Sequence, residues 1–248
     1  MSNLFKNKKF SLSVLVIVFV FIISIFFYFR LSQPQKISYP DVTAQKVSDS
    51  ETITNCIPTF THHFTDIATI DSIIPPVFRN SKGTMPTTLL NIKGNASLYM
   101  PTRGVLTQGS YYTEQGAEFY LWEIDIGCGI TVVFDHVTEP VEKIKRLFSN
   151  TPRSDSSTNF FGTSLEMKDG ELVGYTTGSV NAHNWNLAVY DSNEKNYLWE
   201  SQEFKDLPKY YTQVCPFKFY DRQMAKAYED KFILSFNDIT VEKNLCAS

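Results

Sequence analysis

The chain has 248 residues, a formal net charge of −3, and 43% hydrophobic and 15% aromatic residues. A chain of this length can bury a full core, and its aromatic share favours a β-rich interior. The net charge argues against a nucleic-acid binder, because neutralising phosphates requires a clustered Lys/Arg surface, and no such cluster lies beyond the N-terminus.

A long apolar segment comes first in chain order. Residues 10–29, FSLSVLVIVFVFIISIFFYF, contain no charged side chain; about 20 residues at ~1.5 Å rise each suffice to cross a ~30 Å hydrocarbon core. This length exceeds the roughly 7–15 apolar residues of a signal peptide, and no small-x-small cleavage site follows, so an uncleaved transmembrane helix is favoured. Lysines precede the segment, and the positive-inside rule therefore predicts a single-pass plasma-membrane protein with a cytoplasmic N-terminus, residues 1–9, and an extracytoplasmic C-terminal part.

The remaining chain divides by composition. Residues 30–55 are polar, contain proline and show no periodicity, which is typical of a linker. We expect a β-rich domain over residues 56–214 and a C-terminal helical extension over residues 215–248.

The cysteine count indicates disulfides. Four cysteines, an even number, follow the apolar segment, and no two have the close spacing of a zinc knuckle. Three pairings are possible; we favour Cys56–Cys128 with Cys215–Cys246, because the second pair would close off a C-terminal unit.

Strand patterns dominate the central region. Period-2 alternation and aromatic or β-branched residues occur in segments 96–112, 117–137 and 184–191, and the glycine-bracketed IGCGI at 126–130 is typical of a hairpin turn. Helical spacing is confined to short stretches at 139–148 and 216–232. The sequence therefore predicts antiparallel strands with one or two short helices.

Three segments appear in an order that resembles a known family. They are LYMPTRGVLTQG (98–109), EIDIGCGITVVFDHV (123–137) and LEMKDGELVGYTTGSVNAHNWNLAVYD (165–191). This series resembles the lysostaphin or LytM-type zinc endopeptidases of bacterial cell walls, with KDGELVGYTTG as its most specific part. The resemblance covers under half the chain and implies a barrel-sandwich fold with a duplicated hybrid motif.

The family's chemistry needs a zinc held by a His and an Asp four residues later, together with the second His of an H-x-H motif. On the resemblance, H-x-H falls on Asn184 and Asn186. An amide carbonyl is a poor zinc ligand beside imidazole, so the zinc site of the family is expected to be lost and no cofactor is expected. The first ligand pair would lie near residues 84–91, which contain neither His nor Asp.

The four histidines differ in how their positions match the family pattern. His136 falls on the family position whose histidine assists the reaction without holding the metal, whereas His183 is one residue out of register. His62 with Asp66 forms an H-x-x-x-D pattern too far upstream for the family spacing, and His63 follows it directly. Structural roles are common for such isolated histidines, so these remain candidates only.

Together with the apolar segment 10–29, the resemblance leads us to expect a degenerate, membrane-anchored peptidase-like domain that binds a cell-envelope ligand, such as a wall peptide, a glycan or a protein, without cleaving it. His136, His183, Asn184 and Asn186 would supply polar contacts, and Trp185 a stacking surface. Two alternatives remain open: a metallopeptidase or cell-wall hydrolase with a site rebuilt from His62 or His63, His136 and His183, and a structural cell-surface assembly component.

Overall fold

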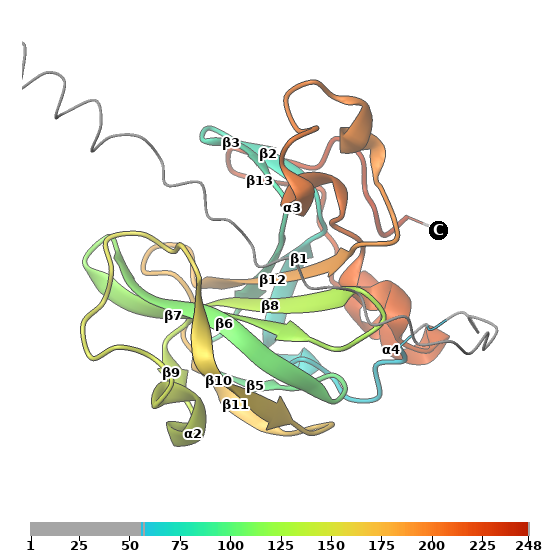
Figure 1. The fold of residues 1–248 in the computed structure, drawn as a ribbon. Coiled ribbons are helices and arrows are strands. Elements are labelled where there is room, and N and C mark those ends of the chain that lie inside the picture. The colour runs from blue at the N-terminus through green and yellow to red at the C-terminus, as the bar shows by residue number, and fades with distance from the viewer. Residues whose placement is uncertain (1–55, 57, 248) are drawn as a thin grey trace, which may run out of the picture. The chain divides into compact units, whose positions relative to one another are not determined.

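The computed structural model describes Cys56 and residues 58–247 (Figure 1). These residues are mainly β, with antiparallel sheets and a few short helices, as the sequence predicts. The predicted transmembrane segment 10–29 and nearly all of the linker lie outside the described residues. No helix within the described part is both long enough and apolar enough to cross a bilayer.

Seven strands form the largest sheet, in the order β1-β4-β12-β8-β7-β6-β10. All neighbouring pairs in it are antiparallel. Its strands are β1 (Ile70–Ile74), β4 (Thr88–Ile92), β6 (Gly104–Glu114), β7 (Ala117–Asp125), β8 (Ile130–Val137), β10 (Asn159–Met167) and β12 (Asn184–Asp191).

The predicted IGCGI turn joins β7 to β8. Gly127, Cys128 and Gly129 have φ values of 81°, 58° and 75°. Glycine adopts this left-handed region at little cost, so the two glycines allow the chain to reverse within a few residues. The hairpin prediction is confirmed.

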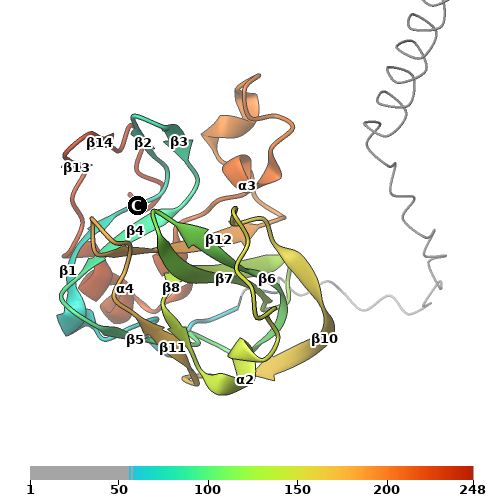
Figure 2. The same cartoon turned by 90° about the vertical axis from the view of Figure 1, so that its left-hand side faces the viewer.

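Two smaller sheets flank the large one (Figure 2). The first has the order β5-β11-β9, with β5 (Ala96–Tyr99), β11 (Leu172–Thr176) and β9 (Glu139–Pro140). The second has the order β13-β14-β2-β3, with β13 (Ser235–Phe236), β14 (Ile239–Thr240), β2 (Phe78–Asn80) and β3 (Gly83–Met85). This second sheet unites the start and the end of the described chain.

The helices are single turns or little more. They are η1 (Ile67–Thr69), α2 (Glu142–Lys145), η2 (Tyr197–Glu200), α3 (Pro208–Tyr211), η3 (Pro216–Phe219) and α4 (Arg222–Glu229). Helices α2, η3 and α4 lie inside the two stretches that show helical spacing.

The C-terminal segment is part of the same compact unit as the β strands. Asp221 caps α4 by accepting a hydrogen bond from the Met224 N–H at 2.8 Å, and Tyr228 of α4 is fully buried against Phe217, with ring centroids 4.5 Å apart. Strand β14 then pairs with β2 through Thr240 and Arg79. Residues 215–247 thus contribute to the core and to a sheet.

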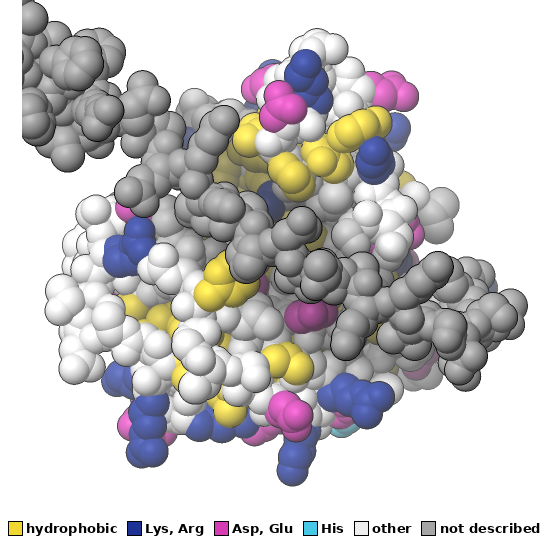
Figure 3. Space-filling model, in the orientation of Figure 1, with side chains coloured by type: hydrophobic (Ala, Val, Ile, Leu, Met, Phe, Trp, Pro, Cys, Tyr) yellow, Lys and Arg dark blue, Asp and Glu magenta, His cyan; other side chains and the backbone are white. Residues whose placement is uncertain are grey.

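Charged side chains are spread over the surface. On the face drawn in Figure 3, Lys and Arg side chains alternate with Asp and Glu side chains over the described residues. This face presents no continuous basic stripe of the kind that follows a phosphate backbone.

Both favoured disulfides are present. Cys56 pairs with Cys128 across 72 residues, which ties the start of the described chain to the β7–β8 turn. Cys215 pairs with Cys246 across 31 residues and ties the end of the chain to the segment before η3. The preference for these two pairings is confirmed, because the fold brings the segments of each pair together.

The Cys215–Cys246 bond should stabilise the fold by restricting the unfolded chain. Replacing both residues (Cys215→Ser with Cys246→Ser) should lower the free energy of unfolding by about 2–4 kcal/mol. Urea unfolding of the full chain, followed by the fluorescence of the buried Trp122 and Trp185, measures this change. A reductant should destabilise the wild type further, because it also opens the other bond; superimposable curves for variant and wild type would contradict the prediction.

Candidate functional site

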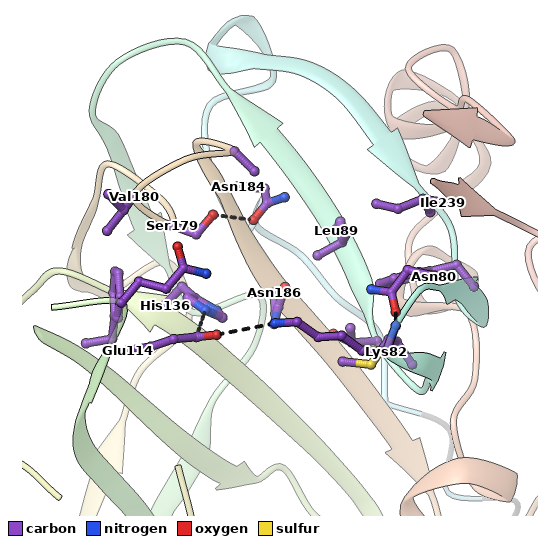
Figure 4. A pocket seen from close by; sticks show the side chains of 16 residues that line it. Asn80, Lys82, Leu89, Glu114, His136, Ser179, Val180, Asn184, Asn186 and Ile239 are labelled. Carbon is purple, nitrogen blue, oxygen red and sulfur yellow. Dashed lines mark hydrogen bonds and ion pairs between the residues drawn. The ribbon is translucent and has the colours of Figure 1, made fainter. Parts of the chain in front are cut away.

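A pocket of about 240 Å³ lies between the seven-stranded sheet and the β2–β3 hairpin (Figure 4). It receives side chains from both ends of the described chain. Its lining combines apolar residues with amides, hydroxyls and charged groups: Phe78, Asn80, Lys82, Met85, Thr87, Leu89, Glu114, Gln115, Phe119, His136, Ser179, Val180, Ala182, Asn184, Asn186 and Ile239.

Strand β12 presents two asparagines to this pocket. Successive side chains of a strand point to opposite faces, so Asn184 and Asn186 face the pocket while Trp185 faces the core. Trp185 is 0% exposed and stacks on Phe134, with ring centroids 5.8 Å apart. The expectation that Trp185 offers a stacking surface to a ligand is therefore wrong.

His136 lies in the same pocket at the end of β8. Its Nε2 is 2.9 Å from a carboxylate oxygen of Glu114, and its Nδ1 is 3.5 Å from a carboxylate oxygen of Asp135. Its φ of 59° is unusual for a residue with a side chain. This backbone is held by the Asp135 carboxylate, which accepts the His136 N–H at 2.7 Å, and by the His136 carbonyl, which accepts the Thr176 hydroxyl at 2.5 Å.

Further hydrogen bonds hold the Asp135 carboxylate. The Tyr112 hydroxyl donates to it at 2.6 Å, and Nδ2 of Asn186 donates at 3.2 Å. Because a carboxylate only accepts, the Asn186 amide must turn its Nδ2 to Asp135. We call the group Tyr112, Glu114, Asp135, His136 and Asn186 the His136 network.

The His136 network favours the protonated imidazole. Burial opposes the charged form, but the negative charge of Asp135, 3.5 Å from Nδ1, and the charge and hydrogen bond of Glu114 outweigh it and raise the pKa of His136 to about 10. The pKa of Glu114 is lowered by its hydrogen bond from His136. Burial pushes the pKa of Asp135 upward, yet the neighbouring His136 charge lowers it on balance. A protonated imidazole has no free lone pair and can neither take up a proton nor bind a metal.

The other histidines lie elsewhere. His183 is exposed, with a φ of 50°, and contributes its backbone to the 179–183 turn through a 3.0 Å hydrogen bond from its N–H to the Ser179 carbonyl. His62 and His63 line a separate pocket together with Asp66. The structure therefore does not gather the histidines proposed for a rebuilt metal site, and within Cys56 and residues 58–247 no three His, Cys, Asp or Glu side chains are placed to hold a metal ion.

Two charged pocket residues could not be identified from the sequence. Glu114 ends β6 beside the tight turn at Gln115 and Gly116, and Lys82 lies at the turn of the β2–β3 hairpin. Neither residue belongs to a motif. The β6–β7–β8 pairing brings Glu114 to His136, and the β2–β3 turn places Lys82 beside Glu114, so no local signal could have found them.

No protein family and no curated protein matches the chain. Among solved structures, Csd3 from Helicobacter pylori is similar at 10% identity over 70% of this chain and 38% of that one, with a TM-score of 0.36. The solution structure of lysostaphin is similar at 12% identity over 66% of this chain and 51% of that one, with a TM-score of 0.33. The chain thus spans about four-tenths and one half of these proteins, and scores of this size assign no family.

The His136 network should make stability depend on pH. The pKa of His136 rises from 6.5 to about 10 on folding, so its stabilising contribution is complete below about pH 6.5 and is lost as the pH rises through about 10. The variant His136→Gln should be less stable by roughly 3 kcal/mol at about pH 7, because it leaves two carboxylates without their cation. This gap should close at high pH.

Chemical denaturation across the pH range checks this expectation. The exposed His183→Gln is the matched control, since His183 also has a positive φ, and it should not reproduce the pH-dependent gap. A gap between wild type and His136→Gln that does not vary with pH would contradict the charged state of His136.

Proposed function

We propose that this protein is a membrane-anchored, extracytoplasmic LytM-like protein that binds a cell-envelope ligand in the pocket around His136 without cleaving it. One observation is the main support for this proposal. The three positions that the sequence resemblance assigns to family site residues, 136, 184 and 186, line one pocket, yet their side chains are engaged in hydrogen bonds and ion pairs.

The side chains that line the pocket do not provide a ligand set for a zinc ion. Zinc in such sites takes three good protein ligands from imidazole, thiolate and carboxylate groups. The neighbour of Asn186 on β4 is Leu89, and the preceding pocket residues on this side are Met85 and Thr87. Apolar and hydroxyl side chains thus occupy the region where the family's first ligand pair is expected.

The pocket is suited instead to holding a polar ligand. Oδ1 of Asn184 accepts the Ser179 hydroxyl at 2.8 Å, which fixes that amide at the pocket wall. Oδ1 of Asn186 is buried and meets no donor among the described residues. Buried polar atoms are normally paired, so an acceptor of this kind favours a ligand or water that donates a hydrogen bond.

The proposed location is supported by the sequence and by the cysteine chemistry. Residues 10–29 are apolar and preceded by lysines, which favours an extracytoplasmic C-terminal part. Disulfides persist in oxidising compartments, and no cysteine among the described residues is free. The ligands available on the extracytoplasmic side include wall peptides, glycans and envelope proteins.

Retention on envelope material tests the proposal. The purified full chain in detergent should sediment with isolated envelopes, and Asn184→Leu should reduce the retained fraction about tenfold, because it removes an amide of the pocket wall and leaves the His136 network intact. The exposed Asn150→Leu is the matched control and should be retained like the wild type. Circular dichroism confirms that each variant is folded.

Two results would overturn the proposal. Equal retention of Asn184→Leu and the wild type would place binding outside this pocket. Chelator-sensitive release of soluble fragments by a chain that carries about one zinc would show a hydrolase.

A further inference from the structure

Two acceptor atoms in the pocket are open. Glu114 uses Oε2 for its contact with His136, while its Oε1 lies 3.9 Å from the ammonium of Lys82, beyond hydrogen-bonding distance. Oδ1 of Asn186 lacks a donor within the described part of the chain. Its orientation is fixed, because Nδ2 of the same amide donates to Asp135. Both atoms can accept a hydrogen bond, so the pocket favours a ligand that donates one.

The charges of the network favour a cationic donor. Two carboxylates, Asp135 and Glu114, face one protonated imidazole, His136, which leaves one negative charge that, among the described residues, only the exposed Lys82, 3.9 Å from Glu114, offsets. An ammonium group placed here would neutralise it. The lowered pKa of Glu114, caused first by its hydrogen bond from His136 and opposed by burial, keeps this carboxylate charged.

The ammonium group of Lys82, from the chain itself, lies near this position. Lys82 extends from the β2–β3 turn toward Glu114 (Figure 4). The turn is fixed by Asn80, whose Oδ1 accepts the Lys82 N–H at 2.9 Å. The Lys82 side chain is 71% exposed and makes no close hydrogen bond with Glu114, so this ion pair is weak and can be replaced.

The pocket also suits an aliphatic stem. Phe78, Leu89 and Ile239 belong to one apolar cluster beside the polar network, and all three line the pocket. A lysine side chain places four methylene groups before its ammonium and buries such a stem against apolar surface while the charge meets polar groups. An amino sugar has no such stem.

We propose that the pocket binds the ammonium end of a lysine-type side chain carried by a peptide, and that Lys82 is the competing occupant from the chain itself. This inference rests on the proposed function and names the ligand of that site. Glu114 supplies the opposite charge, Asn186 the neutral acceptor, and the Phe78, Leu89 and Ile239 side chains the contact for the stem.

Titration of the purified full chain in detergent with small probes tests this assignment. Nα-acetyl-lysine amide should bind, whereas Nα-acetyl-norleucine amide, which keeps the stem and lacks the charge, should bind at least about tenfold more weakly. Lys82→Gln should tighten binding of the lysine probe several-fold by removing the competitor, and Glu114→Gln should abolish it. Lys93→Gln is the matched control, since Lys93 is an exposed lysine paired with Asp71 at 3.0 Å.

Three outcomes would overturn the inference: equal binding of the two amides, stronger binding of glucosamine than of the lysine probe, or an unchanged affinity in Lys82→Gln. Lys82 is exposed, so that variant is expected to fold and to give a decisive result. Envelope retention that depends on Asn184 would survive such an outcome, which separates failure of this inference from failure of the proposed function.

Discussion

The position of His136 between the carboxylates of Glu114 and Asp135 is the constraint on which the pocket depends. The histidine brings together the end of β6, the end of β8 and, through Asp135 and Asn186, the start of β12. Placing two carboxylates in a partly buried site is costly unless a cation and hydrogen-bond donors accompany them. The imidazolium, the Tyr112 hydroxyl and the Asn186 amide meet that requirement.

The same arrangement determines what the site can do. A histidine that serves as a general base or a metal ligand must be neutral and have a free lone pair. Here two carboxylates hold it in the protonated form, so its charge organises the pocket and is not available for proton uptake. The remaining atoms, Oε1 of Glu114 and Oδ1 of Asn186, are acceptors, which is consistent with the donor-bearing ligand that we propose.

Much of the fold could be predicted because the relevant signals are local. Alternation and the glycine-bracketed turn gave the β7–β8 hairpin and β12, helical spacing gave α2 and α4, and the cysteine count gave two disulfides. The sheet formed by β2, β3, β13 and β14 could not be predicted in this way. Its strands are only two or three residues long and join segments far apart in the sequence.

The candidate site shows the same division. The resemblance named His136, Asn184 and Asn186, and these three residues line one pocket, whereas Glu114 and Lys82 line it without belonging to any motif. Trp185 was assigned wrongly although strand alternation alone would have excluded it, because a residue between two pocket-facing asparagines must face the opposite side. His183 lies one residue before β12 begins and is exposed in the 179–183 turn.

The protonation state of His136 tests the central claim most directly. In nitrogen-detected NMR of the full chain in detergent at about pH 8, both ring nitrogens of His136 should carry a proton, and about one equivalent of zinc should leave their signals in place, since the pKa of this histidine is about 10. A neutral ring at this pH, with one nitrogen signal shifted by zinc, would show that the pocket is a metal site and would contradict the account.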